Sequence, residues 1–182
     1  RKRKMISITE KTLQDLEFNT VLETIAGRCN TDIGEAKAMA ITPFKNKEEL
    51  LINLKQTSEY LSSFSNNNAI PNHGFENINY ELKFLAIEDS FLEVGSFKKI
   101  SNLSETAITL IQFLKKFEDY YPNLYQKASQ IDIVKLILQR IDEVVDKFGI
   151  IKDNASPDLI DIRRNINVVR GKINQSFGMA LS

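Results

Sequence analysis

The sequence predicts an all-α fold, with a multi-helix core followed by one long C-terminal helix. Apolar residues recur every three or four positions along most of the 182 residues, which is the period of amphipathic helices. The composition, 42% hydrophobic and 26% charged, is that of an ordinary globular domain. Because a compact unit of this length buries about 70% of its unfolded surface, the chain can build a core without disulfides or metal ions.

The expected helices of the core are bounded by proline, glycine and asparagine residues. They cover residues 13–25, 33–41, 50–64, 97–117 and 134–148. The first is expected to break near Phe18, and the second to end before Pro43, because proline disfavours helical angles in the residue that precedes it. Residues 69–79, which contain Pro71 and Gly74, are expected to form an irregular connection.

Two later glycines are expected to mark helix boundaries. Gly95 and Ser96 predict a turn before the helix over 97–117. Gly149 is placed to take the left-handed backbone angles of a helix C-terminus, and residues 150–152 are then expected to form a short extended piece.

The last expected helix has the clearest signals. Ser156 supplies a capping hydroxyl, Pro157 a preset φ angle, and Asp158 a negative charge near the positive end of the helix dipole. The apolar residues that follow keep strict heptad spacing, which is typical of a helix packed in a bundle or coiled coil. They are Leu159, Ile162, Ile166, Val169 and Ile173. Residues 157–182 would span about 39 Å. Since no helix-ending signal follows them, we expect this helix to be unfinished and the chain to be the N-terminal part of a larger protein.

The charge of the chain is balanced, with 24 basic and 24 acidic residues. Arg1, Lys2, Arg3 and Lys4 precede Met5, and without these four the balance is 20 basic against 24 acidic residues, a net charge of −4. Residues 1–4 are interpreted as an expression scar or upstream remnant, with a genuine basic arm as the alternative. The mildly acidic remainder argues against a self-sufficient nucleic-acid binder.

The cellular setting is predicted from what the sequence does not contain. It has no apolar stretch of the 18 to 20 residues that a membrane helix needs, and no apolar signal-peptide core at its start. The single Cys29 cannot form an internal disulfide, which favours a reducing compartment. We therefore expect a soluble, cytoplasmic protein without membrane contacts.

The inventory of reactive residues predicts no catalytic residue, no cofactor-binding residue and no metal ligand. The sequence has no Gly-x-x-x-x-Gly-Lys-Ser/Thr phosphate loop, and Cys29 with His73 is too few ligands for a zinc site. A Cys29–His73 nucleophile and base is the less favoured alternative to a buried thiol and a loop imidazole. The acidic clusters are expected to be solvated helix faces or helix caps. They are Glu17 with Glu23, Asp142 with Glu143 and Asp146, and Asp158 with Asp161.

Nucleic-acid contacts are considered at two places. The last helix carries four basic residues that could bind phosphates, against the favoured alternative of a solvated outer face. They are Arg163, Arg164, Arg170 and Lys172, and with Asp158 and Asp161 they give the helix a net charge of +2. Tyr120, Tyr121 and Tyr125 could stack on bases, but packing is the favoured role.

The order of these features resembles the N-terminal region of the bacterial MutS-II family, relatives of the mismatch-repair MutS ATPases. The most specific part is the block from Asp153 to Leu159 that runs into Ile162, Arg163 and Arg164. The weaker matches are Leu16-Glu17-Phe18 with Val21-Leu22, Gly34 and Ala36 before Pro43, and Ile70-Pro71. Together they cover nearly the whole chain after Met5.

The resemblance implies a helical core over residues 5–155 and, over 156–182, the start of a lever helix that leads to a clamp domain. It implies that ATP with Mg²⁺, and in many members a nuclease domain, belongs to a downstream part of the parent. The parent is then expected to be a homodimer that acts on double-stranded or branched DNA, or on ribosomes, with this chain as a non-catalytic link. The alternative is a helical adaptor or oligomerisation module that binds a protein partner through the heptad face of the last helix.

Overall fold

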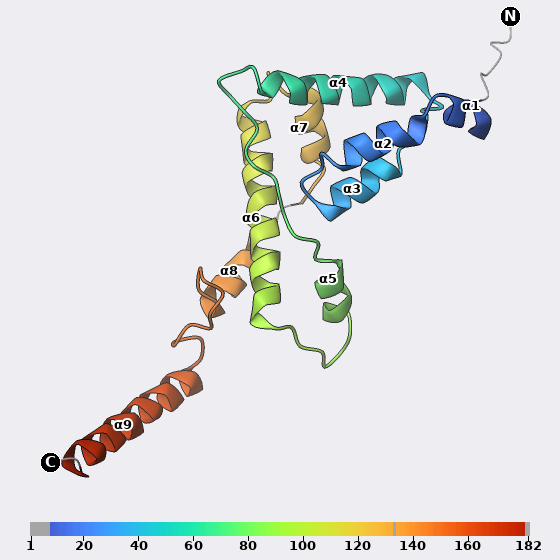
Figure 1. Cartoon of the computed structure of the whole chain (residues 1–182). Coiled ribbons are helices and arrows are strands. Elements are labelled where there is room, and N and C mark those ends of the chain that lie inside the picture. Colours follow the sequence, from blue (N-terminus) through green and yellow to red (C-terminus); the bar gives the residue numbers. More distant parts are fainter. Residues whose placement is uncertain (1–7, 133, 181–182) are drawn as a thin grey trace, which may run out of the picture. The chain divides into compact units, whose positions relative to one another are not determined.

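A computed structural model describes residues 8–132 and 134–180 of the chain (Figure 1). Within these residues the secondary structure consists of helices and one isolated β-bridge, which confirms the predicted all-α fold. The helices are α1 (Glu10–Asp15), α2 (Phe18–Ala26), α3 (Asp32–Met39), α4 (Lys47–Ser63), α5 (Asn79–Leu85), α6 (Val94–Lys116), α7 (Pro122–Ala128), α8 (Lys135–Val144) and α9 (Pro157–Ala180). They divide into two compact units, one built from residues 8–80 and 103–132, the other from 81–102 and 134–180.

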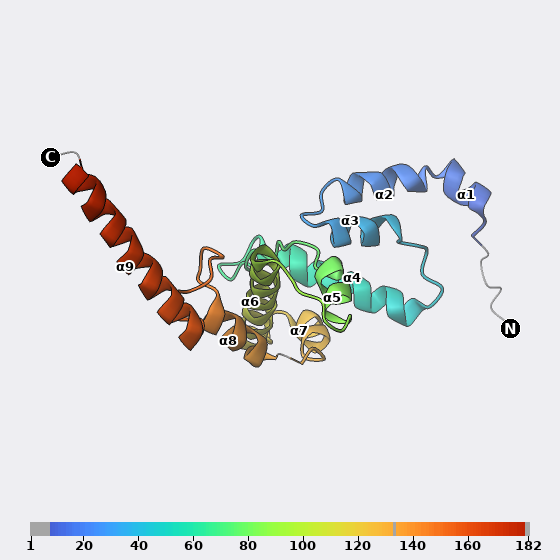
Figure 2. The same cartoon turned by 90° about the horizontal axis from the view of Figure 1, so that it is seen from below.

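The first unit begins with a helical hairpin. The hydroxyl of Thr9 caps α1, and Glu17, with φ of 50°, separates α1 from α2, so the predicted break near Phe18 is confirmed. The Thr31 hydroxyl accepts a hydrogen bond from the Gly34 amide at 3.0 Å and so starts α3. Helices α2 and α3 lie side by side (Figure 2), because small and apolar residues are buried between them. The buried residues of these two helices are Leu22, Ala26 and Ala38.

The main core of the first unit forms between the second half of α6 and α7. Leu114, Tyr121 and Ala128 are buried there, and Tyr121 has no exposed surface at all. The partly buried residues packed against them are Ile111, Phe113, Phe117, Leu124 and Tyr125. Packing is thus the role of Tyr121 and Tyr125, as the favoured interpretation predicted, whereas Tyr120 is 58% exposed. Helix α4 packs against α7 in the same unit.

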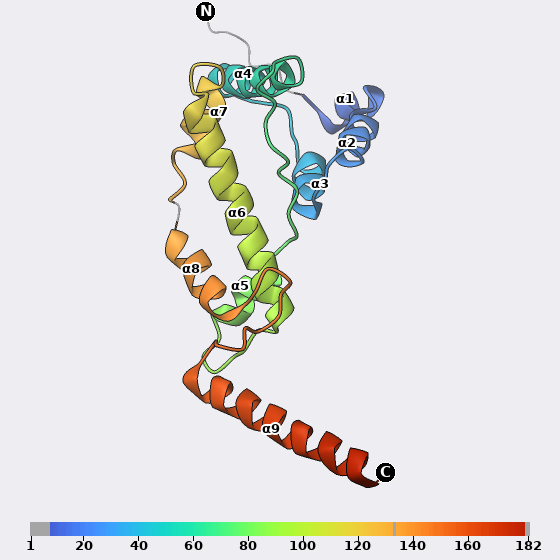
Figure 3. The same ribbon diagram turned by 90° about the vertical axis from the view of Figure 1, so that its left-hand side faces the viewer.

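The second unit is assembled around a buried carboxylate. Glu81 of α5 is only 2% exposed, and its Oε1 accepts a hydrogen bond from the Ser96 hydroxyl and lies 3.4 Å from the Lys99 ammonium, both on α6. Ile100 and Val145 are the buried apolar residues of this unit. Helix α8 leads into a tight chain reversal, which in turn leads into α9 (Figure 3).

Three features of the structure differ from the sequence-based expectations. Helices α5 and α7 were not predicted. The expected turn at Gly95 and Ser96 is wrong, because both residues lie inside the first turn of α6. Gly149 does have a positive φ of 79°, but it lies in the reversal after α8 and does not cap that helix, which ends at Val144.

Candidate nucleic-acid interface

The four candidate phosphate-binding residues all lie on α9, whose start is fixed by local capping. The Ser156 hydroxyl accepts a hydrogen bond from the Leu159 amide at 3.1 Å, which confirms the predicted helix start. Helix α9 then continues for 24 residues without a kink-forming proline, so its backbone is about 36 Å long.

A short hairpin precedes α9 and supports its first turns. Val145 and Ile151 form an antiparallel bridge, so the extended piece expected at 150–152 is found only at its middle position, Ile151. The Asp146 carboxylate closes the turn by accepting hydrogen bonds from the amides of Phe148, at 2.9 Å, and Ile150, at 2.8 Å. Gly149 adopts its left-handed conformation inside this turn.

Arg163 connects α9 to this hairpin. Its guanidinium forms an ion pair with the Asp153 carboxylate and donates a further hydrogen bond to the Ile151 carbonyl at 3.5 Å. Since the side chain is 41% exposed and already has two acceptors, much of its hydrogen-bonding capacity is used inside the protein. Its contribution to the structure is to fix the first two turns of α9 against the segment before it.

The other three basic residues are more exposed. Arg164 lies 3.4 Å from Asp161 on the same helix, an exposed pair of the kind that contributes little to stability. Arg170 and Lys172 have no acidic partner within the described parts of the chain. They are therefore the two of the four whose positive charge is uncompensated.

The directions of the four side chains follow from helical geometry. At about 100° per residue, Arg163 and Arg170 lie within about 20° of each other around α9, and Arg164 lies about 100° away from Arg163. Lys172 lies about 180° from Arg163. The four residues thus surround the helix and do not form one narrow stripe, so their contact with a single phosphate backbone stays a prediction.

The remaining reactive residues have separate local partners. The Cys29 thiol donates to the Ile25 carbonyl at 3.5 Å. The ring nitrogens of His73 lie 3.0 Å from the Pro71 carbonyl and 3.4 Å from the Tyr60 hydroxyl. The structure therefore gives neither residue the other as a hydrogen-bond partner within the described region. Among the described residues, no group of three or more His, Cys, Asp or Glu side chains is arranged to hold a metal ion.

Two carboxylates were missed as organising residues by the sequence analysis. Glu59 caps α7 from α4, and Glu81 joins α5 to α6. Neither is distinguishable from a solvated helix-face glutamate in the sequence, because the partner groups lie 64 and 18 positions away. Within residues 8–132 and 134–180, no helix is long and apolar enough to cross a membrane.

The acidic clusters lie mostly on exposed surfaces, as expected. Asp146 is the exception, because its carboxylate organises the hairpin turn. Glu143 pairs with Arg140 on the surface of α8 at 3.1 Å. Asp161 pairs with Arg164 on the surface of α9 at 3.4 Å.

Comparison with known proteins supports the resemblance found in the sequence. No protein-family model matches the chain. Proteins named Endonuclease MutS2 match it at 28% identity over 173 residues in Alkaliphilus oremlandii and at 24% over 166 residues in Pelotomaculum thermopropionicum. The protein of that name from Staphylococcus aureus strain MRSA252 matches at 25% over 182 residues. These matches cover 91 to 92% of this chain but 21 to 22% of the relatives, so the chain spans about a fifth of their length. Similarity over more than nine tenths of the chain confirms its resemblance to the bacterial MutS-II family.

Proposed function

We propose that this chain is the non-catalytic core and lever segment of a MutS-II-like, DNA-binding ATPase. The observation that carries the proposal is the similarity of nearly the whole chain to about a fifth of proteins named Endonuclease MutS2. In this proposal the chain transmits movement between a nucleotide-binding part and a nucleic-acid-binding part of the parent protein. The parent acts as a homodimer on double-stranded or branched DNA, or on ribosomes.

The geometry of α9 supports a mechanical role. A helix of 24 residues is a stiff rod of about 36 Å, and here its first turns are joined to the hairpin by the Arg163–Asp153 ion pair. Movement of the hairpin would therefore change the direction of the rod. Apolar side chains of α9 such as Ile166 and Ile173 are about half exposed, at 50% and 49%, so the surface of the helix is open to other parts of the parent.

The residues of this chain do not fit an ATP site. The sequence has no phosphate-loop motif, and Gly171 and Gly178 lie well inside α9, where their amides take part in helical hydrogen bonding. We therefore propose that ATP with Mg²⁺ is bound by a different part of the parent. We likewise propose that any endonuclease activity, which the names of the relatives indicate, belongs to a different part of the parent.

The complete reading frame of the parent tests the proposal directly. A phosphate-loop motif downstream of residue 182 in the same reading frame is the expected result. A complete reading frame without such a motif would contradict the coupling role and favour the helical adaptor.

A second test uses the purified chain. We expect no ATP hydrolysis above a buffer blank, no nicking of supercoiled plasmid, and weak binding to a fluorescent four-way DNA junction that declines steeply with added salt. The variant Arg170→Glu with Lys172→Glu should weaken this binding more than Arg163→Glu with Arg164→Glu, because only the former pair carries uncompensated charge. Hydrolysis of ATP by the chain, or tight binding that both charge reversals leave intact, would contradict the proposal.

A further inference from the structure

The tip of the hairpin that precedes α9, residues 146–150, exposes an aromatic ring together with a positive charge. Phe148 is 68% exposed, and Ile150 beside it is 59% exposed. The Lys147 ammonium lies 5.0 Å from the centre of the Phe148 ring, in a cation–π contact. The hairpin tip therefore offers a ligand a flat apolar surface and a cation at the same point.

The backbone of the hairpin tip is fixed before any ligand arrives. The Gly149 amide donates to the Asp146 carbonyl at 2.9 Å, and the Asp146 carboxylate accepts the amides of Phe148 and Ile150. The negative charge of Asp146 is thus directed to these two amides. Because the turn is already closed, little backbone entropy is lost when a ligand binds to the Phe148 ring.

A second lysine reaches the hairpin tip from α6. The side chain of Lys98 lies against the turn, since its Cδ atom is 3.2 Å from the position that a Cβ atom on Gly149 would occupy. Within the residues that the structure describes, Lys98 and Lys147 have no acidic partner, whereas the nearby Asp153 is paired with Arg163. Two uncompensated positive charges therefore flank the Phe148 ring.

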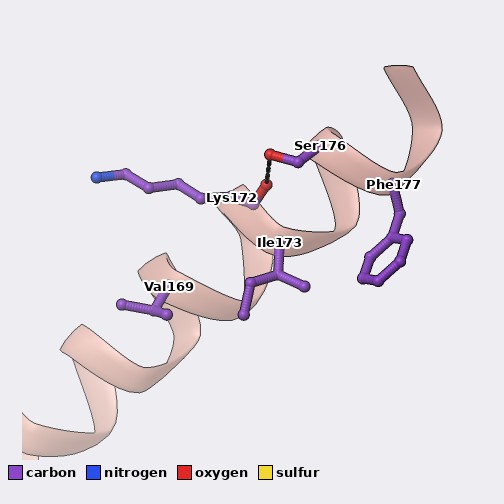
Figure 4. Close-up of a pocket in the computed structure, with 5 residues that line it drawn as sticks. All are labelled: Val169, Lys172, Ile173, Ser176 and Phe177. Atoms are coloured by element: carbon purple, nitrogen blue, oxygen red, sulfur yellow. Dashed lines mark hydrogen bonds between the residues drawn. The ribbon is translucent and has the colours of Figure 1, made fainter. Parts of the chain in front are cut away.

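Helix α9 carries an exposed phenylalanine without this arrangement. Phe177 is 66% exposed, nearly the same as Phe148. It lies at an open pocket of about 410 Å³ whose other lining residues are Val169, Lys172, Ile173 and Ser176 (Figure 4). Figure 4 shows the Lys172 side chain directed away from the Phe177 ring. Lys172 thus does not cover the ring of Phe177 as Lys147 covers the ring of Phe148.

An exposed aromatic ring between lysines is a combination that binds single-stranded nucleic acid. Every base has a flat face that stacks on an aromatic side chain once the base is unpaired, and ammonium groups hold the phosphates on either side. A membrane surface fits less well, because interfacial binding uses the long apolar face of a helix and the hairpin tip is a turn of five residues. An unpaired strand is therefore the ligand that its chemistry favours.

We propose that the hairpin tip binds an unpaired segment of DNA, with one base stacked on Phe148 and the flanking phosphates held by Lys98 and Lys147. The tip has no group placed to read a base edge, so this binding is independent of sequence. The choice of DNA as the nucleic acid rests on the proposed function, and the stacking site itself does not.

Fluorescence anisotropy of the 182-residue chain with a labelled oligothymidine of about twelve nucleotides tests the stacking at low salt. Phe148→Ala should weaken binding at least about fivefold, the effect of losing one stacked base. Phe177→Ala is the matched control, since it removes an equally exposed ring, and it should leave binding unchanged. Circular dichroism checks that both variants fold. No measurable binding by the unsubstituted chain, or equal losses in the two variants, would overturn the proposal.

Three further probes separate stacking from other kinds of binding. An abasic oligonucleotide of the same length keeps the phosphates, and we expect it to bind at least about fivefold more weakly and to be insensitive to Phe148→Ala. Equal binding of the abasic probe would show that charge alone acts and would contradict the proposal. Phosphatidylglycerol vesicles should show no binding that depends on Phe148. Vesicle binding that Phe148→Ala abolishes, or tighter binding of oligouridine than of oligothymidine, would contradict the choice of ligand.

The salt dependence of oligothymidine binding tests the two lysines. Each of Lys98→Ala and Lys147→Ala should reduce the slope of log K against log salt concentration by about 0.7, the value for one phosphate contact on a single strand. Unchanged slopes in both variants would overturn the assigned phosphate contacts. None of these measurements involves ATP or the parent's reading frame, so failure here leaves the proposed coupling role standing.

Discussion

Glu59 of α4 caps the N-terminus of α7 from 64 positions away in the sequence, by accepting the amide hydrogen of Asn123 at 3.0 Å. Its second carboxylate oxygen accepts the Leu124 amide at 2.9 Å. The first amides of a helix have no partner inside the helix, and a carboxylate is also favoured by the dipole there. A side chain on one helix thus completes the start of another and joins α4 to α7.

Replacing Glu59 with alanine should lower the free energy of unfolding by about 1–3 kcal/mol, because two helix-start amides lose a charged acceptor. Chemical denaturation followed by circular dichroism measures the change. Glu105→Ala is the control, since Glu105 is an exposed carboxylate in the middle of α6, away from any helix start. If both variants unfold alike, the cap does not contribute to stability.

Tyr121 offers a test of the loop that follows α4. Its hydroxyl donates to the Asn68 carbonyl at 2.6 Å, and the side chain is completely buried. Tyr121→Phe should cost about 0.5–1.5 kcal/mol, the net contribution of one hydrogen bond. Tyr120→Phe, at a residue that is 58% exposed, should be neutral within error. Thermal unfolding of the two single variants against the unsubstituted chain provides the comparison, and an equal loss in both would contradict the role of the hydrogen bond.

Glu81 should make the stability of the chain depend on pH. The hydrogen bond from its own backbone, followed by the charge and hydrogen bonds of Lys99 and Ser96, holds the pKa of Glu81 below its ordinary value of 4.5, although burial acts in the opposite direction. A carboxyl with a lowered pKa in the folded state contributes stability above its unfolded pKa and loses it as the pH falls through the folded pKa.

The stability difference between the unsubstituted chain and Glu81→Gln should accordingly be largest above pH 4.5 and shrink on acidification below it. Urea midpoints measured from neutral pH downward give this difference. Glu88→Gln, at an exposed position of the following loop, should show no such trend. A difference that is constant across the range would mean that the ionised form of Glu81 is not what stabilises the unit.

Two glycines should respond to alanine in opposite directions. Gly149 has φ of 79°, and an added Cβ would lie 3.2 Å from the Lys98 side chain, so Gly149→Ala should destabilise the chain by about 1–2 kcal/mol. Gly171 lies in α9 with no atom near its Cβ position, so Gly171→Ala should stabilise the helix by up to about 1 kcal/mol. Helical ellipticity and the unfolding midpoint of each variant distinguish these two effects. A higher unfolding midpoint for Gly149→Ala would contradict the positive φ of Gly149.

The elements that the sequence predicted well are those with local causes. Helix α9 has its hydroxyl cap, its proline and its apolar period within one continuous segment. Helix α3 starts at the Thr31 hydroxyl, which caps it from the adjacent position, and ends at Met39, before Pro43 as expected. These features need no contact from elsewhere in the chain. The positive φ of Gly149 was likewise predicted from the residue itself, although the hairpin turn in which it lies is closed by Asp146.

The elements that the sequence missed depend on distant partners. Helix α7 has seven residues and is capped by Glu59, and α5, also of seven residues, is held by the contact of Glu81 with Lys99. Helices this short are not stable on propensity alone. At the candidate site, the sequence alone identified the four basic residues of the last helix. The ion pair of Arg163 with Asp153 could not be identified in this way, because it depends on how the hairpin folds against the start of α9. The sequence therefore does not show that the charge of Arg163 is compensated while the charges of Arg170 and Lys172 are not.

The ion pair between Arg163 and Asp153 also has a consequence for force. Arg163 lies about 9 Å along α9 from its first residue, whereas the described end of the helix lies about 35 Å away. A sideways push at the far end is thus multiplied about fourfold at the guanidinium, if the helix turns about Pro157. A load on the far end of α9 is therefore borne near its start, by the contacts of Arg163 with the Asp153 carboxylate and the Ile151 carbonyl.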